Sequence, residues 1–156
     1  MKIKTHKSET WRYDKKTKLW IPYRKRMFVY WFKFLQIAIV EKHKINSKMY
    51  RGWDIKNINQ DTKFDDWWES HWIKLFSIKQ IGDKSKFTLS TTRGKSHYIN
   101  WCIKVGQNLH IGSYPKIARQ INYPYGESNA YITKTFSRMK SDYNKMLKNV
   151  CNGQFP

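Results

Sequence analysis

The sequence is poor in cysteine, proline and glycine. Of its 156 residues, 2 are cysteine, 4 are proline and 7 are glycine. Cys102 and Cys151 lie far apart without a CxxC spacing, which argues against a disulfide framework and against a zinc site. We therefore expect both thiols to be buried or incidental, in a protein of a reducing, intracellular compartment.

No apolar run in the sequence is long enough to predict a transmembrane helix. The most apolar segment, 27–40, is interrupted by Lys33 and Gln36, and it is shorter than the about 20 residues that a span requires. The N-terminal residues also lack the continuous apolar region of a secretory signal. We expect no membrane partner and a cytoplasmic location, including association with a nucleoid or a virion.

The sequence patterns of common enzyme sites are also missing. No phosphate-binding glycine loop, GxSxG elbow or HExxH pair is present. Asp65, Asp66, Glu69 and His71 form the one acid–histidine cluster, and carboxylates of this kind serve metal-dependent nucleases. The dipole at a helix start already explains all three acids, and we favour this interpretation. We expect no catalysis, no metal and no cofactor, and a small metal-dependent nuclease stays as an alternative.

Basic residues dominate the charge of the chain. There are 31 Lys and Arg residues against 11 Asp and Glu, which gives a formal net charge of +20. Two basic blocks, 1–53 and 84–156, flank the neutral to acidic segment 54–83. Such a surplus repels itself in a folded protein and indicates an anionic partner. Nucleic acid is favoured because each neutralised phosphate releases a counterion, and membrane headgroups and an acidic protein are the competing partners.

The first half of the chain, 1–80, predicts an aromatic-rich helical region. Short aromatic runs at 11–13 and 19–21 flank a polar turn, which is typical of a small β-hairpin, although a loop also fits. Pro22 then suits the first position of a helix over about 23–44. The middle of that helix is apolar on nearly every side, which indicates the central helix of a bundle.

A second helix is predicted over 62–78, with Thr62 as its cap and apolar residues at helical spacing. The exposed aromatic residues near Trp11, Trp20 and Trp53 would anchor a protein partner, if the chain has one. Residues 81–95 are rich in Gly, Ser and Thr, so we predict a linker there and a separate module over 96–156.

The module over 96–156 resembles a helix-turn-helix DNA-binding unit. Ser96 begins one helix, Ser113 caps a short one with Pro115 in its first turn, and Ser128 or Asn129 caps a long one. The residues that carry the resemblance are Ser113, Ile117, Ala118, Ile121, Ile132 and Phe136. The turn is longer than the usual 3–4 residues, and a plain three-helix bundle is the alternative.

The resemblance implies that the polar face of the long helix enters the major groove of duplex DNA. This face contains no carboxylate from Asn129 to Ser141, and Arg138 is its one guanidinium, which suits a bidentate contact to guanine. The candidate DNA-binding residues are Asn129, Thr133, Lys134, Ser137 and Arg138 at the bases, and Ser113, Lys116, Arg119, Lys140, Arg24, Lys25 and Arg26 at the phosphates. Each of them alone also suits a solvated helix surface.

Taken together, these patterns predict an all-α protein with a small N-terminal hairpin and a C-terminal helix-turn-helix-like module. The function we expect is that of a non-enzymatic DNA-binding accessory or regulatory protein. Small size and high lysine content are typical of phage or mobile-element products. A structural or interaction protein, such as a capsid-associated, scaffolding or host-inhibiting factor, is the alternative.

Overall fold

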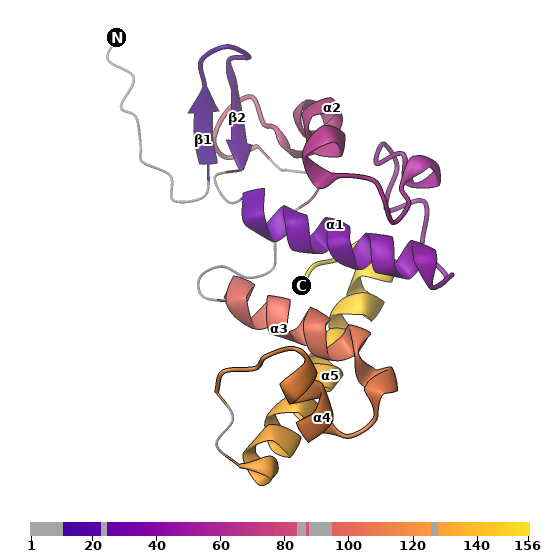
Figure 1. The fold of residues 1–156 in the computed structure, drawn as a ribbon. Coiled ribbons are helices and arrows are strands. Elements are labelled where there is room, and N and C mark those ends of the chain that lie inside the picture. Colours follow the sequence, from indigo (N-terminus) through magenta and orange to yellow (C-terminus); the bar gives the residue numbers. More distant parts are fainter. Residues whose placement is uncertain (1–10, 23–24, 84–86, 88–94, 126–127) are drawn as a thin grey trace.

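A computed structural model describes residues 11–22, 25–83, 87, 95–125 and 128–156, and this part of the chain is mostly helical (Figure 1). The elements in chain order are β1 (Trp11–Asp14), β2 (Leu19–Pro22), α1 (Lys25–Val40), a 3₁₀ turn (Ile55–Asn57), α2 (Phe64–Phe76), α3 (Lys95–Gln107), a second 3₁₀ turn (Leu109–Ile111), α4 (Tyr114–Gln120) and α5 (Asn129–Cys151). The expected all-α class with a small β-hairpin is confirmed. None of the described helices combines the length and the apolar character needed to cross a bilayer.

Helix α1 lies across the middle of the molecule, with β1, β2 and α2 on one side and α3, α4 and α5 on the other (Figure 1). Apolar side chains on nearly every side of α1 are buried, including Trp31, Phe34 and Leu35. This burial explains why the α1 sequence shows no polar face, because both sides of the helix meet other elements. The helix begins at Lys25, so the expectation that Pro22 opens it is wrong. Pro22 instead ends β2, where it pairs with Trp11.

The β1–β2 hairpin is held by hydrogen bonds within its turn and by a bridge from β2 to the segment after α2. At the tip, the Asp14 carboxylate accepts hydrogen bonds from the backbone N–H and the hydroxyl of Thr17. These bonds hold the pKa of Asp14 below its ordinary value. Along β2, Trp20 and Ile78 exchange two backbone hydrogen bonds of 2.9 and 3.0 Å, which attach the hairpin to the segment after α2.

The segment between α1 and α2 contributes to the core rather than to the surface. Trp53 is fully buried and packs on Trp31 and Trp67 with ring centroids 5.5 and 4.9 Å apart. The expectation that Trp53 anchors a partner from an exposed position is therefore wrong. Tyr50 accepts a 2.9 Å hydrogen bond from Trp31 Nε1 and donates to the carbonyl oxygen of Val150, so this segment joins α1 to the end of α5.

The N-cap of helix α2 lies one residue later than expected. Lys63 is its N-cap residue, without a side-chain capping bond, and Thr62 is not the cap. The Thr62 hydroxyl oxygen instead accepts a 2.9 Å hydrogen bond from the backbone N–H of Asn59. Gln36 of α1 donates to the carbonyl oxygens of Asn59 and Thr62, both at 2.8 Å, and this fixes the loop that leads into α2.

Helices α3, α4 and α5 form the C-terminal group, and α3 and α5 approach each other closely at Gly106. A Cβ atom added to Gly106 would lie 2.4 Å from Cγ of Tyr143, so glycine is required for this contact. The Ser128 hydroxyl accepts from the backbone N–H of Tyr131 and caps α5, as expected. Gly153, with φ +75°, follows the last turn of α5 in the left-handed conformation that favours glycine.

The two regions expected from the sequence, 1–80 and 96–156, share one hydrophobic core. Of the stretch expected to be a linker, 84–86 and 88–94 lie outside the described residues. Phe87 between them is buried and packs against Trp31 and Phe76, with centroids 5.9 Å apart in both pairs. Helix α5 packs against both α1 and α3, and these two helices together fix its position.

Candidate nucleic-acid interface

Helix α5 has one buried face and one exposed face. The buried face is the apolar row predicted from the sequence: Ile132, Phe136, Met139, Tyr143, Leu147 and Val150. Since an α-helix has about 3.6 residues per turn, residues spaced by three and four positions from Lys134 lie on the opposite side. On that side lie Lys134, Arg138, Lys145 and Lys148, which we call the cation stripe, and all of them are exposed.

The cation stripe is nearly free of neutralising carboxylates in the described part of the chain. The one ion pair there is between Arg138 Nε and Asp142 Oδ2 at 3.9 Å, and the Arg138 side chain is still 81% exposed. At a rise of about 1.5 Å per residue, the stripe runs for about 21 Å from Lys134 to Lys148. One strand of B-DNA carries a phosphate about every 3.4 Å along the duplex axis. The stripe is thus long enough to face several phosphates at once.

The predicted residues of α5 fall into two rows rather than one patch. By helical spacing, Asn129, Thr133, Ser137 and Lys140 form one row, which begins beside α4 at Asn129. Lys134 and Arg138 begin the cation stripe, which faces α3 at Arg138. The Thr133 hydroxyl donates a 2.8 Å hydrogen bond to the carbonyl oxygen of Asn129, so its proton is engaged within the helix.

A shallow hollow of about 430 Å³ separates α4 from the start of α5. It brings together two of the predicted residues, Arg119 and Asn129, with Ser128 beside them. Ser113 and Lys116 of the same helical pair are exposed, and Ser113 is the N-cap residue of α4 without a side-chain capping bond. These side chains are therefore available to a polar partner at the lower end of the molecule.

The N-terminal phosphate candidates lie at the other side of the molecule. Lys25 Nζ forms a 2.6 Å ion pair with Asp65 and lies 5.6 Å from the ring centroid of Phe64, so it joins α1 to α2. Arg26 is exposed in the first turn of α1. Arg24 lies outside the described residues. The structure thus leaves Arg26 as the free cation among the described members of this set.

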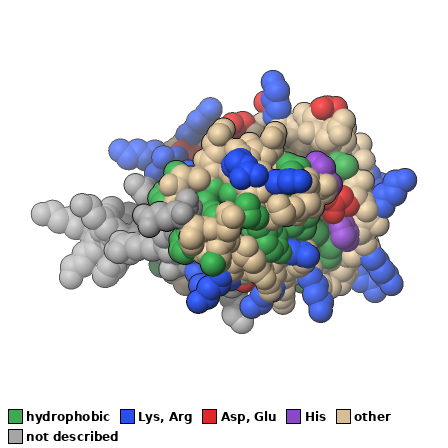
Figure 2. All heavy atoms as spheres, turned by 60° about the horizontal axis from the view of Figure 1, so that its bottom comes forward, with side chains coloured by type: hydrophobic (Ala, Val, Ile, Leu, Met, Phe, Trp, Pro, Cys, Tyr) green, Lys and Arg blue, Asp and Glu red, His purple; other side chains and the backbone are tan. Residues whose placement is uncertain are grey.

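Figure 2 shows the end of the molecule that carries α4 and the start of α5. Lys and Arg side chains project at the top, right and bottom of this face, and hydrophobic side chains are exposed between them. The exposed aromatic residues of this region are Tyr125 and Tyr131, which are 54% and 48% exposed. Net charge alone therefore does not locate an interface on this molecule, and the regular spacing of cations along α5 is the more specific observation.

The sequence patterns did not single out the second half of the cation stripe. Lys145 and Lys148 lie near the end of α5, where the helix dipole favours cations, so their presence there needs no binding role. Extending the spacing of four and three residues from Lys134 and Arg138 through Ser141 leads directly to both lysines. At its end the stripe reaches a further hollow of about 330 Å³, where Lys148 lies with His43 and Lys44.

The acidic cluster on α2 gives no sign of a metal site. Asp65 is engaged by Lys25, and His71 uses Nδ1 in a 2.7 Å contact to the carbonyl oxygen of Trp67. Within the described ranges, no three His, Cys, Asp or Glu side chains lie close enough together to hold a metal ion.

Cys102 is buried and Cys151 half-buried, and both are free thiols.

The chain matches no protein-family model, and no curated protein or solved structure shows significant similarity to it. Its function is therefore argued from the geometry of α5 and its neighbours.

Proposed function

We propose that this chain is a non-enzymatic nucleic-acid-binding protein, with duplex DNA as its favoured partner and an accessory or regulatory role. The observation that carries the proposal is the cation stripe of Lys134, Arg138, Lys145 and Lys148, four exposed cations in a line on one rigid helix. A line of like charges raises the free energy of the isolated protein. A phosphate backbone lowers it again, because the bound cations displace condensed counterions.

In this proposal the two rows of α5 have different tasks. The cation stripe lies along the phosphates and sets the position of the helix. The row beside α4, which begins with Asn129, is directed toward the bases, where amide and hydroxyl groups contact base edges. Arg119 and Lys116 add phosphate contacts from α4, and Ser113 a further one.

The alternative of a protein partner bound through the aromatic hairpin has less support. Trp53 belongs to the core, and Trp11 and Trp20 are half-buried. Tyr13, which is 46% exposed, is then the main aromatic surface of the hairpin. Hot spots of protein interfaces are clusters of several well-packed aromatic residues and arginines, and one tyrosine does not make such a cluster.

The proposal is tested by mobility shift of the full chain with a random duplex, single-stranded DNA and RNA across a salt series. We expect a shift of the duplex at low salt that weakens steeply as salt is added. Absence of a shift with all three polymers at low ionic strength would overturn the proposal. A stronger shift with RNA or single strands than with duplex would keep the class of partner but replace duplex DNA as the favoured one.

A further inference from the structure

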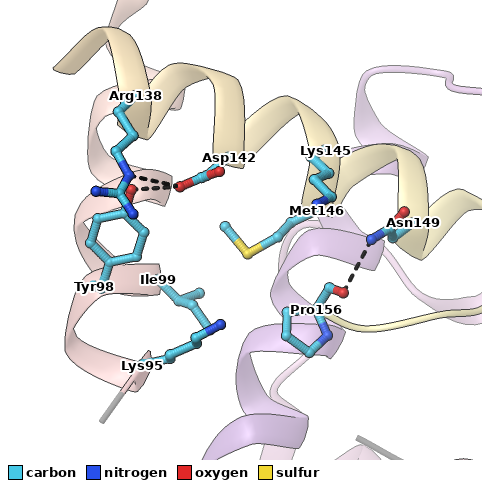
Figure 3. Close-up of a pocket in the computed structure, with 9 residues that line it drawn as sticks. All are labelled: Lys95, Tyr98, Ile99, Arg138, Asp142, Lys145, Met146, Asn149 and Pro156. Atoms are coloured by element: carbon cyan, nitrogen blue, oxygen red, sulfur yellow. Dashed lines mark hydrogen bonds and ion pairs between the residues drawn. The ribbon is translucent and has the colours of Figure 1, made fainter. Parts of the chain in front are cut away.

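A hollow of about 620 Å³ lies between the first turn of α3 and the middle of α5 (Figure 3). Its inner wall is apolar, because Ile99 and Met146 are both buried against the core. Pro156 forms the opposite wall, where its carbonyl oxygen accepts a 3.1 Å hydrogen bond from Nδ2 of Asn149. The volume falls within the range of about 300–1,000 Å³ that is typical of sites for small organic ligands.

The rim of this hollow is positively charged. Lys95 extends into it from α3, and Arg138 and Lys145 reach it from α5 (Figure 3). Asp142 is the one acidic side chain among the lining residues, and its carboxylate already accepts a 2.6 Å hydrogen bond from the Tyr98 hydroxyl. Burial and this hydrogen bond raise the pKa of Tyr98 far above its ordinary value, so the tyrosine remains a donor. Among the side chains that line the hollow, three cations thus face one carboxylate, and that carboxylate already has Tyr98 and Arg138 as partners.

The hollow is continuous with the cation stripe, because Arg138 and Lys145 belong to both. A strand that follows the stripe therefore passes the mouth of the hollow. An apolar wall bordered by cations complements a nucleotide, which joins a flat base to a phosphate. A paired base within a duplex has no access to such a recess, since its edges and faces are occupied by its partner and its neighbours.

We propose that this hollow takes one unpaired nucleotide, with its phosphate between Lys95, Arg138 and Lys145 and its base on the wall of Ile99 and Met146. The inference rests on the proposed function, because the strand that delivers the nucleotide lies on the cation stripe. With this site, the preferred ligand is a nucleic acid that has an unpaired nucleotide next to a duplex, at an overhang or a junction.

The experiment compares a short blunt duplex with the same duplex carrying a single-stranded thymidine extension, each labelled and titrated with the full chain by fluorescence anisotropy. A base on this wall removes apolar surface from water, so we expect about tenfold tighter binding of the extended duplex, which corresponds to about 1.4 kcal/mol. Lys95→Ala is expected to remove most of this preference, because Lys95 lines the hollow but does not belong to the stripe. Lys104→Ala is the matched control, since Lys104 is an exposed lysine of the same helix that lies 4.5 Å from the ring centroid of Trp101, away from the hollow.

A second variant tests the hollow without changing charge. Met146→Phe places a larger side chain against the wall, and its folding is checked by thermal melting. We expect it to lose the preference for the extended duplex while its affinity for the blunt duplex stays unchanged. Equal affinities of the unmodified chain for both duplexes would overturn the hollow as a nucleotide site and leave the proposed function standing. Equal effects of Lys95→Ala and Lys104→Ala would also overturn it, and absence of binding to either duplex would overturn both proposals.

Discussion

Replacing Gly106 with alanine tests how α3 holds α5 in place. The new Cβ would lie 2.4 Å from Cγ and 2.5 Å from Cδ1 and Cδ2 of Tyr143. The Tyr143 ring has little room to move, because it is buried and packs on Phe34 with centroids 5.4 Å apart. Overpacking of this kind costs about 1–3 kcal/mol. Alanine gains about 0.8–1 kcal/mol over glycine inside a helix, so we expect a net loss of up to about 2 kcal/mol.

The measurement is urea-induced unfolding of four proteins: the unmodified chain, Gly106→Ala, Tyr143→Ala and the double variant. In the Tyr143→Ala background the clash is gone, so Gly106→Ala should stabilise by its helix propensity alone, about 0.8–1 kcal/mol. The sign of the effect thus reverses between the two backgrounds. A stabilising Gly106→Ala in the unmodified chain would refute the close α3–α5 contact, and with it the placement of both rows of α5 relative to α3.

Three further changes test other parts of the structure. Ser128→Ala removes the cap of α5 and should lower the free energy of unfolding by about 0.5–2 kcal/mol in chemical denaturation. Ser137→Ala, on the exposed face of the same helix, is the control and should change it little. Equal effects of the two variants would contradict the cap. Trp31→Phe should lower the free energy of unfolding by about 1 kcal/mol more than Trp53→Phe. The reason is that Trp31 Nε1 donates to Tyr50, whereas the buried Trp53 Nε1 has no partner in the described structure. The reverse order in urea-induced unfolding would contradict this arrangement of the core. Burial raises the pKa of Cys102 from 9.0 to about 12, so its contribution to stability is full below pH 9 and declines as the pH rises toward 12. Cys102→Ala should make this alkaline decline shallower, and an unchanged pH profile would show that the thiol does not contribute.

The sequence was informative where one periodicity decided the structure. The apolar row from Ile132 to Val150 predicted which face of α5 is buried, and Ser128 was among its expected caps. Local patterns failed where distant partners decide. Pro22 suits a helix start by itself, but pairing with Trp11 keeps it in a strand. Trp53 follows a glycine in a turn-like segment, and only its packing on Trp31 and Trp67 shows that it belongs to the core.

The same distinction holds for the candidate interface. Lys134 and Arg138 were predicted because their helix and its polar face are readable from spacing. The role of Lys95 was not, since it depends on where the first turn of α3 meets α5 and on the hollow between them. Lys25 shows the converse, because its ion pair with Asp65 joins residues forty positions apart and could not be expected from local charge.

The salt dependence of duplex binding distinguishes contacts made by the cations of one face of α5 from attraction by the net charge of the protein. We would compare the unmodified chain with a stripe variant, Lys134→Ala, Arg138→Ala, Lys145→Ala and Lys148→Ala combined. The matched control combines Lys48→Ala, Lys56→Ala, Lys74→Ala and Lys79→Ala, which removes the same charge from other exposed positions.

Each lost phosphate contact lowers the slope of log K against log salt by about 0.9. The stripe variant should therefore lose about 3.6 from the slope, while the control keeps nearly the slope of the unmodified chain. Between 50 and 200 mM salt, that difference corresponds to about a 150-fold smaller loss of affinity for the stripe variant. Equal slopes for the stripe variant and the control would contradict the account, because binding would then follow the net charge of the protein and not the cations on α5.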